Sequence, residues 1–212
     1  MFDLDGTLSD SAAGILGAMR LAFRDLGLPP LEPEVERTLV GPPWASVLPA
    51  LIGAAATAEA IPLYRRYYTG GMMYETTLYD GVVAVLDALR AAGIRLAVAT
   101  SKPEAYAAPI VEHLGIAGYF ETVCGDGLAA ERGTKGLVVA EALRRLGEPR
   151  PETVTMVGDR LHDVVGAAEN GVACLGAGWG YAQGDELAHA GAVRVFDRPA
   201  DLLAALPELT AS

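Results

Sequence analysis

The stretch Phe2-Asp3-Leu4-Asp5-Gly6-Thr7-Leu8 carries two carboxylates two residues apart, followed by a glycine. If the backbone is extended here, both side chains point to the same side of a strand end, so two negative charges converge on one small volume. Such a pair repels itself unless a cation lies between the carboxylates, and ligation by oxygen favours a hard ion such as Mg²⁺. Alternatively, Asp5-Gly6 is only a turn at a strand exit, and this stretch alone leaves both interpretations open.

Short apolar segments alternate with helical patterns in the second part of the chain. The predicted strands are residues 94–99, 154–157, 172–175 and 193–196. The predicted helices are residues 82–92, 103–114, 135–146 and 162–170, with stop signals at Gly93, Gly115, Gly147 and Gly171. This alternation predicts an α/β fold, a doubly wound, Rossmann-like parallel sheet with helices on both faces.

The segment from Asp10 to Tyr79 breaks this alternation. It carries helical patterns at residues 12–26 and 57–68 without a strand pattern between them, and it is divided by Pro29, Pro30, Pro33, Pro42 and Pro43. We therefore expect an all-helical domain, residues 10–79, inserted into an α/β catalytic core made of residues 1–9 and 80–212.

Composition limits the partners. The chain has 212 residues, of which 51% are hydrophobic and 20% charged, and its formal net charge is −11. Because it has no run rich in Lys and Arg, we expect no nucleic-acid polymer as partner, and an anionic substrate would need a local cation. No apolar run reaches the length of a membrane span, no secretion signal is present, and Cys124 and Cys174 lie in apolar segments. We expect a soluble cytoplasmic protein with no membrane partner; its oligomeric state is open.

Three further segments carry polar residues where predicted strands end or helices begin. They are Ala99-Thr100-Ser101-Lys102-Pro103, Arg132-Gly133-Thr134-Lys135 and Gly158-Asp159-Arg160-Leu161-His162-Asp163. With Asp-Leu-Asp-Gly-Thr-Leu at the first strand, they resemble, in order, the four motifs of the haloacid dehalogenase superfamily of phosphohydrolases. The resemblance extends over nearly the whole chain.

Each match also has a plainer explanation. A hydroxyl and backbone amides at a helix N-terminus suit a phosphoryl oxygen, but Thr100 or Ser101 could instead only cap the next helix. Asp159 and Asp163, four residues apart, share one helix face, but acids also stabilise a helix N-terminus. The assignment of Lys135 rests on the resemblance, since a lone lysine is usually a surface charge. Relatives often have Asp-Gly shortly before the arginine, where this chain has Ala129-Ala130; we expect that loop to differ.

The resemblance implies a mechanism. Asp3 would attack phosphorus in line and form an aspartyl phosphate, while Asp5 would protonate the leaving oxygen and later activate water. Mg²⁺ would be held by Asp3, the Asp5 backbone carbonyl and Asp159. The remaining assigned residues would bind phosphate (Thr100, Ser101 and Lys135) or orient Lys135 or a metal-bound water (Asp163), and His162 would be peripheral.

The resemblance also implies that the insert is a cap that closes over the site and selects the substrate. The strings Ala99 to Pro103, Val157 to Val164 and Gly178 to Tyr181 are similar to those of phosphoglycolate phosphatases and 5′-nucleotidases. The implied substrate is a small phosphorylated metabolite: phosphoglycolate-like, a nucleoside monophosphate or a sugar phosphate. In the cap, Gly41-Pro42-Pro43 would either face this substrate or form a plain turn, and Tyr64 to Tyr68 would either reach the substrate or, as we expect, form a solvated helix face.

Other activities remain open. A sugar phosphate mutase would share every core motif and would retain the phosphoryl group, and a non-catalytic binding protein could keep the same fold. A dehalogenase fits less well, because that chemistry needs no metal and lacks the second acid that Asp5 supplies. Only Met1 and Phe2 precede Asp3, as a trimmed or mis-assigned start would give, so we expect this strand end to be weakly held.

Overall fold

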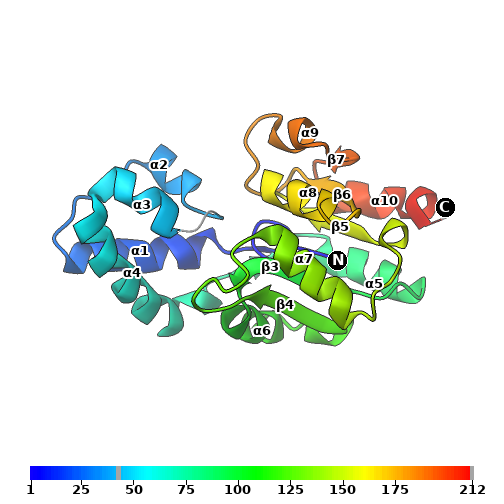
Figure 1. Cartoon of the computed structure of the whole chain (residues 1–212), viewed down its shortest axis with the longest axis horizontal. Coiled ribbons are helices and arrows are strands. Elements are labelled where there is room, and N and C mark those ends of the chain that lie inside the picture. Colours follow the sequence, from blue (N-terminus) through cyan, green and yellow to red (C-terminus); the bar gives the residue numbers. More distant parts are fainter. Residues whose placement is uncertain (42–43, 211–212) are drawn as a thin grey trace. The chain divides into compact units, whose positions relative to one another are not determined.

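The structure is a computed structural model that describes residues 1–41 and 44–210 (Figure 1). The chain forms two compact units, one made of residues 1–10 and 78–212 and the other of residues 11–77. The chain therefore crosses between the units at 10/11 and 77/78, one or two residues from the expected boundaries. We call these units the core unit and the inserted unit.

The core unit is built on a parallel sheet with the N-terminal residues at its centre. Its strands are β3 (Ala97–Pro103), β4 (Thr122–Asp126), β5 (Thr155–Gly158), β6 (Ala173–Ala177) and β7 (Arg194–Phe196). Strand β3 pairs with β4, strand β5 with β6 and β6 with β7, all in parallel. Phe2 joins the two sets, because it bridges to Val98 of β3 on one side and to Val157 of β5 on the other.

Helices cover this sheet. They are α5 (Val82–Ala91), α6 (Glu104–His113), α7 (Lys135–Arg145), α8 (Leu161–Ala168), α9 (Glu186–Ala190) and α10 (Pro199–Thr210), with short 3-10 turns at Ala117–Tyr119 and Pro151–Thr153. Helix α7 packs against α8, and α10 packs against α5 (Figure 1). Ala97 and Ala99 of β3 point into a core shared with Val138, Val139 and Ala142 of α7, as the two-residue period of a strand requires.

The inserted unit is helical. It contains α1 (Ala12–Asp25), α2 (Pro33–Thr38), α3 (Trp44–Ile52), α4 (Ala54–Thr69) and a 3-10 turn at Met72–Tyr74. Helix α1 buries Ile15, Met19 and Phe23, four residues apart, on the face that packs on α4. Two-residue strands, β1 (Ser9–Asp10) and β2 (Thr77–Leu78), lie at the two crossings.

The fold class predicted from the alternation is confirmed. All eight predicted elements of the second part of the chain are present, and each predicted stop glycine follows its helix at a positive φ. The pattern missed β4 as a strand, and it also missed helices α9 and α10. In the described residues no helix is long and apolar enough to cross a membrane.

Candidate active site

Asp3 lies at the carboxyl end of the central strand segment, between β3 and β5. The backbone is held on both sides: Phe2 N donates to Ala97 O (2.9 Å) and Ala99 N to Phe2 O (2.8 Å), while Asp3 N donates to Val157 O and Val157 N to Met1 O (both 2.9 Å). The expectation of a weakly held strand end is therefore wrong, because neighbouring strands on both sides supply the hydrogen bonds. The strands that follow in the chain lie on both sides of this central segment, β3 and β4 on one side and β5 on the other. The strand order therefore reverses here, and ligands of open α/β sheets bind where it reverses.

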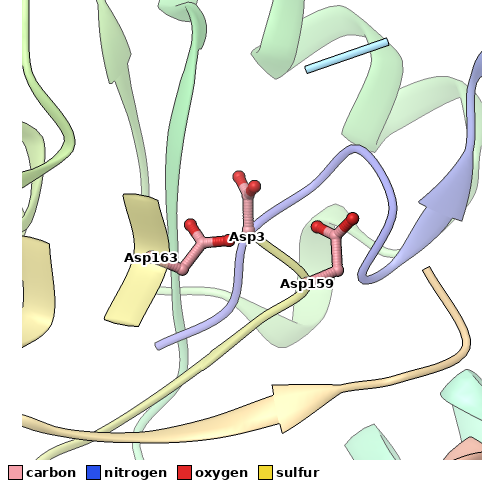
Figure 2. A group of neighbouring side chains, drawn as sticks. All are labelled: Asp3, Asp159 and Asp163. Atoms are coloured by element: carbon pink, nitrogen blue, oxygen red, sulfur yellow. The ribbon is translucent and has the colours of Figure 1, made fainter. Parts of the chain in front are cut away.

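Three carboxylates meet at this edge of the sheet (Figure 2). One oxygen from each of Asp3, Asp159 and Asp163 lies within 4.8 Å of the other two, and both Asp159 and Asp163 are almost fully buried. Asp159 directly follows β5, and Asp163 lies in the first turn of α8, where its Oδ2 accepts from Arg160 N at 3.0 Å. The four-residue spacing thus places both acids beside Asp3.

Lys135, the first residue of α7, is the cation inside this cluster. Its Nζ lies 2.8 Å from Asp3 Oδ1 and 2.6 Å from Asp163 Oδ1, and its side chain is only 3% exposed. Burial lowers the pKa of Lys135, but Asp163 and Asp3 outweigh burial and raise it, so the ammonium stays protonated. The surface-charge interpretation of Lys135 does not apply here, and Asp163 lies where it orients this lysine.

The cluster carries more negative charge than its own residues neutralise. Three carboxylates against one ammonium leave two negative charges. Burial, followed by the nearby charges, raises the pKa of Asp3 to about 6 despite Lys135, and burial with Asp163 and Asp3 raises the pKa of Asp159 well above its ordinary value. Closely spaced carboxylate oxygens with two uncompensated charges are the donor set that a divalent cation such as Mg²⁺ prefers. The residues present therefore fit a metal ion.

Close backbone packing fixes Asp159 next to the first motif. Its Oδ1 accepts from the Thr7 hydroxyl (3.2 Å) and its Oδ2 from Tyr181 N (2.8 Å). A Cβ on Gly6, which has φ +83°, would lie 2.1 Å from Asp159 Oδ2. Only glycine therefore fits at position 6, which gives the Asp-Gly of the motif a packing role in addition to its turn.

Asp5 is not part of the carboxylate cluster. Its Oδ1 lies 2.9 Å from Nζ of Lys102, whose side chain is 6% exposed, and the charge of Asp5 raises the pKa of Asp3 less than the charge of Asp163 does. The backbone bends at Leu4, so the extended geometry assumed for Asp3 and Asp5 ends before Asp5. The charge of Asp5 still acts on Asp3, so the convergence of these two side chains stays a prediction.

Lys102 is a site residue that sequence reasoning missed. It lies two residues after Thr100 on β3, and residues with that spacing share one side of a strand. This spacing was the available signal.

Thr100 and Ser101 do not cap the next helix. Helix α6 begins after Pro103 and has no side-chain cap, and the buried Thr100 hydroxyl instead accepts from Lys102 N at 3.2 Å. The capping explanation is therefore wrong. Thr100 lies at the end of β3, beside the central strand segment, whereas Ser101 is exposed.

The loop before Lys135 is held by a residue that the sequence analysis did not assign. Asp126, at the end of β4, accepts from Gly127 N (2.7 Å) and Arg132 N (2.8 Å) at Oδ1 and from Gly133 N (3.3 Å) at Oδ2. The Arg132 guanidinium donates to Gly125 O at 2.8 Å. Asp126 thus closes the loop that contains Ala129-Ala130 and delivers Lys135 to the site.

The candidate cap residues give a mixed result. Gly41 is exposed, and Pro42 and Pro43 lie outside the described residues. In the Tyr64 to Tyr68 stretch, Tyr64 stacks against Trp44 and the buried Tyr68, with ring centroids at 4.0 and 5.3 Å. Tyr64 and Tyr68 thus pack inside the inserted unit, whereas Arg65 and Arg66 are exposed, as expected for a solvated helix face.

Comparison with known proteins identifies the family. The family model described as "Haloacid dehalogenase-like hydrolase" matches residues 1–177. The solved structure of a haloacid dehalogenase-like family hydrolase from Streptococcus pneumoniae has a TM-score of 0.90 and 30% identity, covering 97% of this chain and 96% of its own. That of a predicted phosphatase from Clostridium acetobutylicum has a TM-score of 0.89 and 32% identity, covering 98% and 96%.

Curated relatives have several names. The tyrosine-protein kinase PtkA of Mycobacterium tuberculosis is 44% identical over 185 residues, which are 87% of this chain but 63% of the kinase. A 5′-nucleotidase of Pseudomonas aeruginosa is 37% identical (88% and 85% covered), and a phosphoglycolate phosphatase of Chromobacterium violaceum is 36% identical (88% and 87% covered). With the family model and both structures, these matches place the chain in the family of haloacid dehalogenase-like hydrolases.

Proposed function

We propose that this protein is a phosphatase of small phosphorylated metabolites that works through a phosphorylated Asp3. The observation that carries the proposal is the contact of Lys135 with Asp3 (2.8 Å) inside a cluster of three buried carboxylates. A nucleophilic carboxylate needs a cation beside it when it attacks an anionic phosphoryl group, and here one is already in place.

Asp3 attacks phosphorus in this mechanism. An Asp3 oxygen forms the new bond to phosphorus while the bond to the leaving oxygen breaks, and Asp5 gives that oxygen a proton. In the second half Asp5 takes a proton from water, the water oxygen bonds to phosphorus, and the bond to Asp3 breaks to release phosphate. Lys135 offsets the charge of the phosphoryl oxygens throughout, and Thr100 donates to one of them.

We further propose that Asp3, the Asp5 backbone carbonyl and Asp159 hold Mg²⁺. When bound, the ion neutralises charge on the transferring group. Asp163 then keeps Lys135 in position, since its Oδ1 lies 2.6 Å from the ammonium. The inserted unit, residues 11–77, would serve as the cap that selects the substrate.

The test uses p-nitrophenyl phosphate as a generic substrate. We expect hydrolysis that requires Mg²⁺, stops with EDTA and is lost in Asp3→Asn, whose amide is a poor nucleophile. Asp87→Asn is the matched control, because Asp87 is an exposed acid of the core unit that contacts Tyr119 and not the cluster. Robust turnover without metal, or full activity of Asp3→Asn, would show the proposal to be wrong.

The relatives suggest the substrate panel. It contains phosphoglycolate, nucleoside monophosphates and sugar phosphates, with inorganic phosphate release as the readout. Isomerised sugar phosphate without phosphate release would indicate a mutase instead.

A second candidate is phosphoryl transfer to tyrosine. The observation that favours it is the 44% identity to relatives named tyrosine-protein kinase, although the match covers 63% of their length. The same Asp3 and Lys135 would serve, with ATP as donor and a tyrosine hydroxyl in place of water. Incubation with γ-labelled ATP and a tyrosine peptide separates the two: labelled peptide supports the kinase, and labelled phosphate alone supports the hydrolase.

A further inference from the structure

The segment Gly178 to Tyr181, which follows β6, donates hydrogen bonds to the first motif and to Asp159. Its backbone is fixed by Gly178 N donating to Phe196 O (2.8 Å) and Gly180 N donating to Ala177 O (3.1 Å). The Trp179 indole donates to Thr7 O at 3.0 Å, which ties the segment to the first motif. The segment is therefore a rigid part of the core unit.

Tyr181 contacts Asp159 through its backbone and Asp10 through its side chain. Its backbone N–H donates to Asp159 Oδ2 at 2.8 Å, and its phenol hydroxyl donates to Asp10 Oδ1 at 2.7 Å. Asp10 is the last core residue before the chain crosses into the inserted unit. A single residue thus links the carboxylate assigned to the metal with the first crossing.

The second crossing reaches the same place. Tyr79 lies two residues after the 77/78 boundary, and its backbone N–H donates to Leu8 O at 3.1 Å. Burial and then Asp10 raise the pKa of Tyr79, while a hydrogen bond with Tyr181 opposes them. The side chains of Asp10, Tyr79 and Tyr181 therefore form one group at the two crossings.

The packing leaves little room for this group to move independently of Asp159. A Cβ on Gly180 would lie 2.2 Å from Gly6 O and 2.4 Å from Asp159 Cβ. The backbone of Gly180, next to Tyr181, thus packs in direct contact with the first motif and with Asp159. A shift of Tyr181 has to move Asp159 or break the hydrogen bond between them.

We propose that Tyr181 is a positioning residue that couples the two crossings of the chain to Asp159. Metal held at Asp159 then orders the crossings, and ordered crossings favour the metal-binding position of Asp159 by the same factor, since coupling between two sites is reciprocal. The metal part of the proposal rests on the proposed function.

The test is hydrogen exchange at residues 8–12 and 77–81 of the full chain, with and without Mg²⁺. In the wild type we expect Mg²⁺ to slow exchange at both crossings. Tyr181→Phe removes only the hydroxyl and keeps the N–H to Asp159. We expect about three- to tenfold faster exchange at the crossings of the metal-free variant, as for the loss of one hydrogen bond, and no slowing when Mg²⁺ binds.

Matched variants separate this coupling from a general loss of structure. Tyr119→Phe removes a similar phenol contact, 2.8 Å to Asp87, and should exchange like the wild type. Asp10→Ala should speed exchange at the crossings as Tyr181→Phe does, and the double variant should exchange no faster than either single variant. Asp10→Asn, whose amide oxygen still accepts, should exchange almost as slowly as the wild type. The Mg²⁺ dissociation constant of Tyr181→Phe, measured by calorimetry, should rise by the same factor by which Mg²⁺ slows exchange at the crossings of the wild type.

Two results would overturn the coupling: unchanged exchange at the crossings of Tyr181→Phe, or equal protection by Mg²⁺ in this variant and the wild type. A wild type that binds no Mg²⁺ would instead contradict the proposed function together with the metal arm of the coupling. The link between Tyr181 and the crossings would then still be judged by exchange in the metal-free proteins.

Discussion

The two units of this protein treat buried charge in opposite ways. In the core unit, Asp3, Asp159 and Asp163 share a single ammonium, that of Lys135. In the inserted unit, the buried Glu36 is paired with one guanidinium, that of Arg20, whose Nε donates to Glu36 Oε1 at 3.0 Å. The insert thus neutralises its buried acid, whereas the core keeps two negative charges without a partner of their own.

This difference indicates where function lies. A structural ion pair leaves no net charge buried, because each partner neutralises the other. An excess of buried carboxylate raises the free energy of the metal-free fold and is retained where it binds something, as strain at functional sites generally is. The following predictions test this contrast.

The largest effect should come from removing the cation. Lys135→Met leaves three carboxylates without compensation, so we expect the metal-free protein to lose about 3–5 kcal/mol of unfolding free energy at pH 7.5, measured by urea denaturation. Lowering the pH to 5 should recover part of this loss, because the carboxylates can then take up protons.

Lys102→Met is the control for Lys135→Met. Lys102 pairs with Asp5, which is 15% exposed at its side chain and so retains some hydration, and the loss should be clearly smaller. Equal losses in both variants would mean that Lys135 belongs to an ordinary buried pair.

The second prediction concerns Asp159. In Asp159→Asn the amide oxygen can still accept from Tyr181 N, and the amide NH₂ can donate to the Thr7 hydroxyl, which is able to reverse its role. We expect Mg²⁺ affinity to fall on the order of a hundredfold, because a proposed ligand is lost. The metal-free variant should nevertheless be at least as stable as the wild type. Asp87→Asn should change neither property, and a destabilised Asp159→Asn would argue against uncompensated charge.

The third prediction is a pH dependence. The pKa of Asp3 is raised to about 6 in the metal-free fold, above the ordinary value of 3.8, so the folded state binds this proton more tightly than the unfolded state. The contribution of Asp3 to stability should therefore fall as the pH rises from about 4 to about 6. In the same window Mg²⁺ affinity should rise, by up to about tenfold per pH unit for each proton displaced.

Asp3→Asn isolates this contribution. It lacks the titrating group, so the difference in unfolding free energy between the wild type and this variant should follow the expected trend, measured without metal. A difference that does not change with pH would contradict it.

Sequence reasoning found the residues that follow strand ends. Thr100, Asp159 and Asp163 stand where an apolar run stops or a helix begins, and such positions gather at one edge of a parallel sheet, whereas the assignment of Lys135 rested on the family resemblance. The structure brings Lys135, Asp159 and Asp163 together beside Asp3, while the catalytic roles of these residues remain predictions.

Lys102 and Tyr181 were missed for a physical reason. Their contacts join residues 97 and 22 positions apart, and no local period encodes which side chain reaches across. The extended backbone assumed for Asp3 and Asp5 was wrong, because the chain bends at Leu4. Strand β4 was missed because only Val123 and Cys124 form an apolar run in it, which is shorter than the runs from which the other strands were predicted.

The smallest effect should come from the compensated pair of the inserted unit. Glu36→Gln keeps the shape of the side chain and removes its charge, and Arg20, which is 58% exposed at its side chain, can turn to water. We expect a loss of about 1 kcal/mol in unfolding free energy and no change in the pH dependence of Mg²⁺ affinity. Glu34→Gln, an exposed position on the same helix α2, is the control and should be neutral. If Glu36→Gln instead changed Mg²⁺ binding as strongly as Asp159→Asn, buried charge in the two units would not be independent, and the contrast drawn between them would fail.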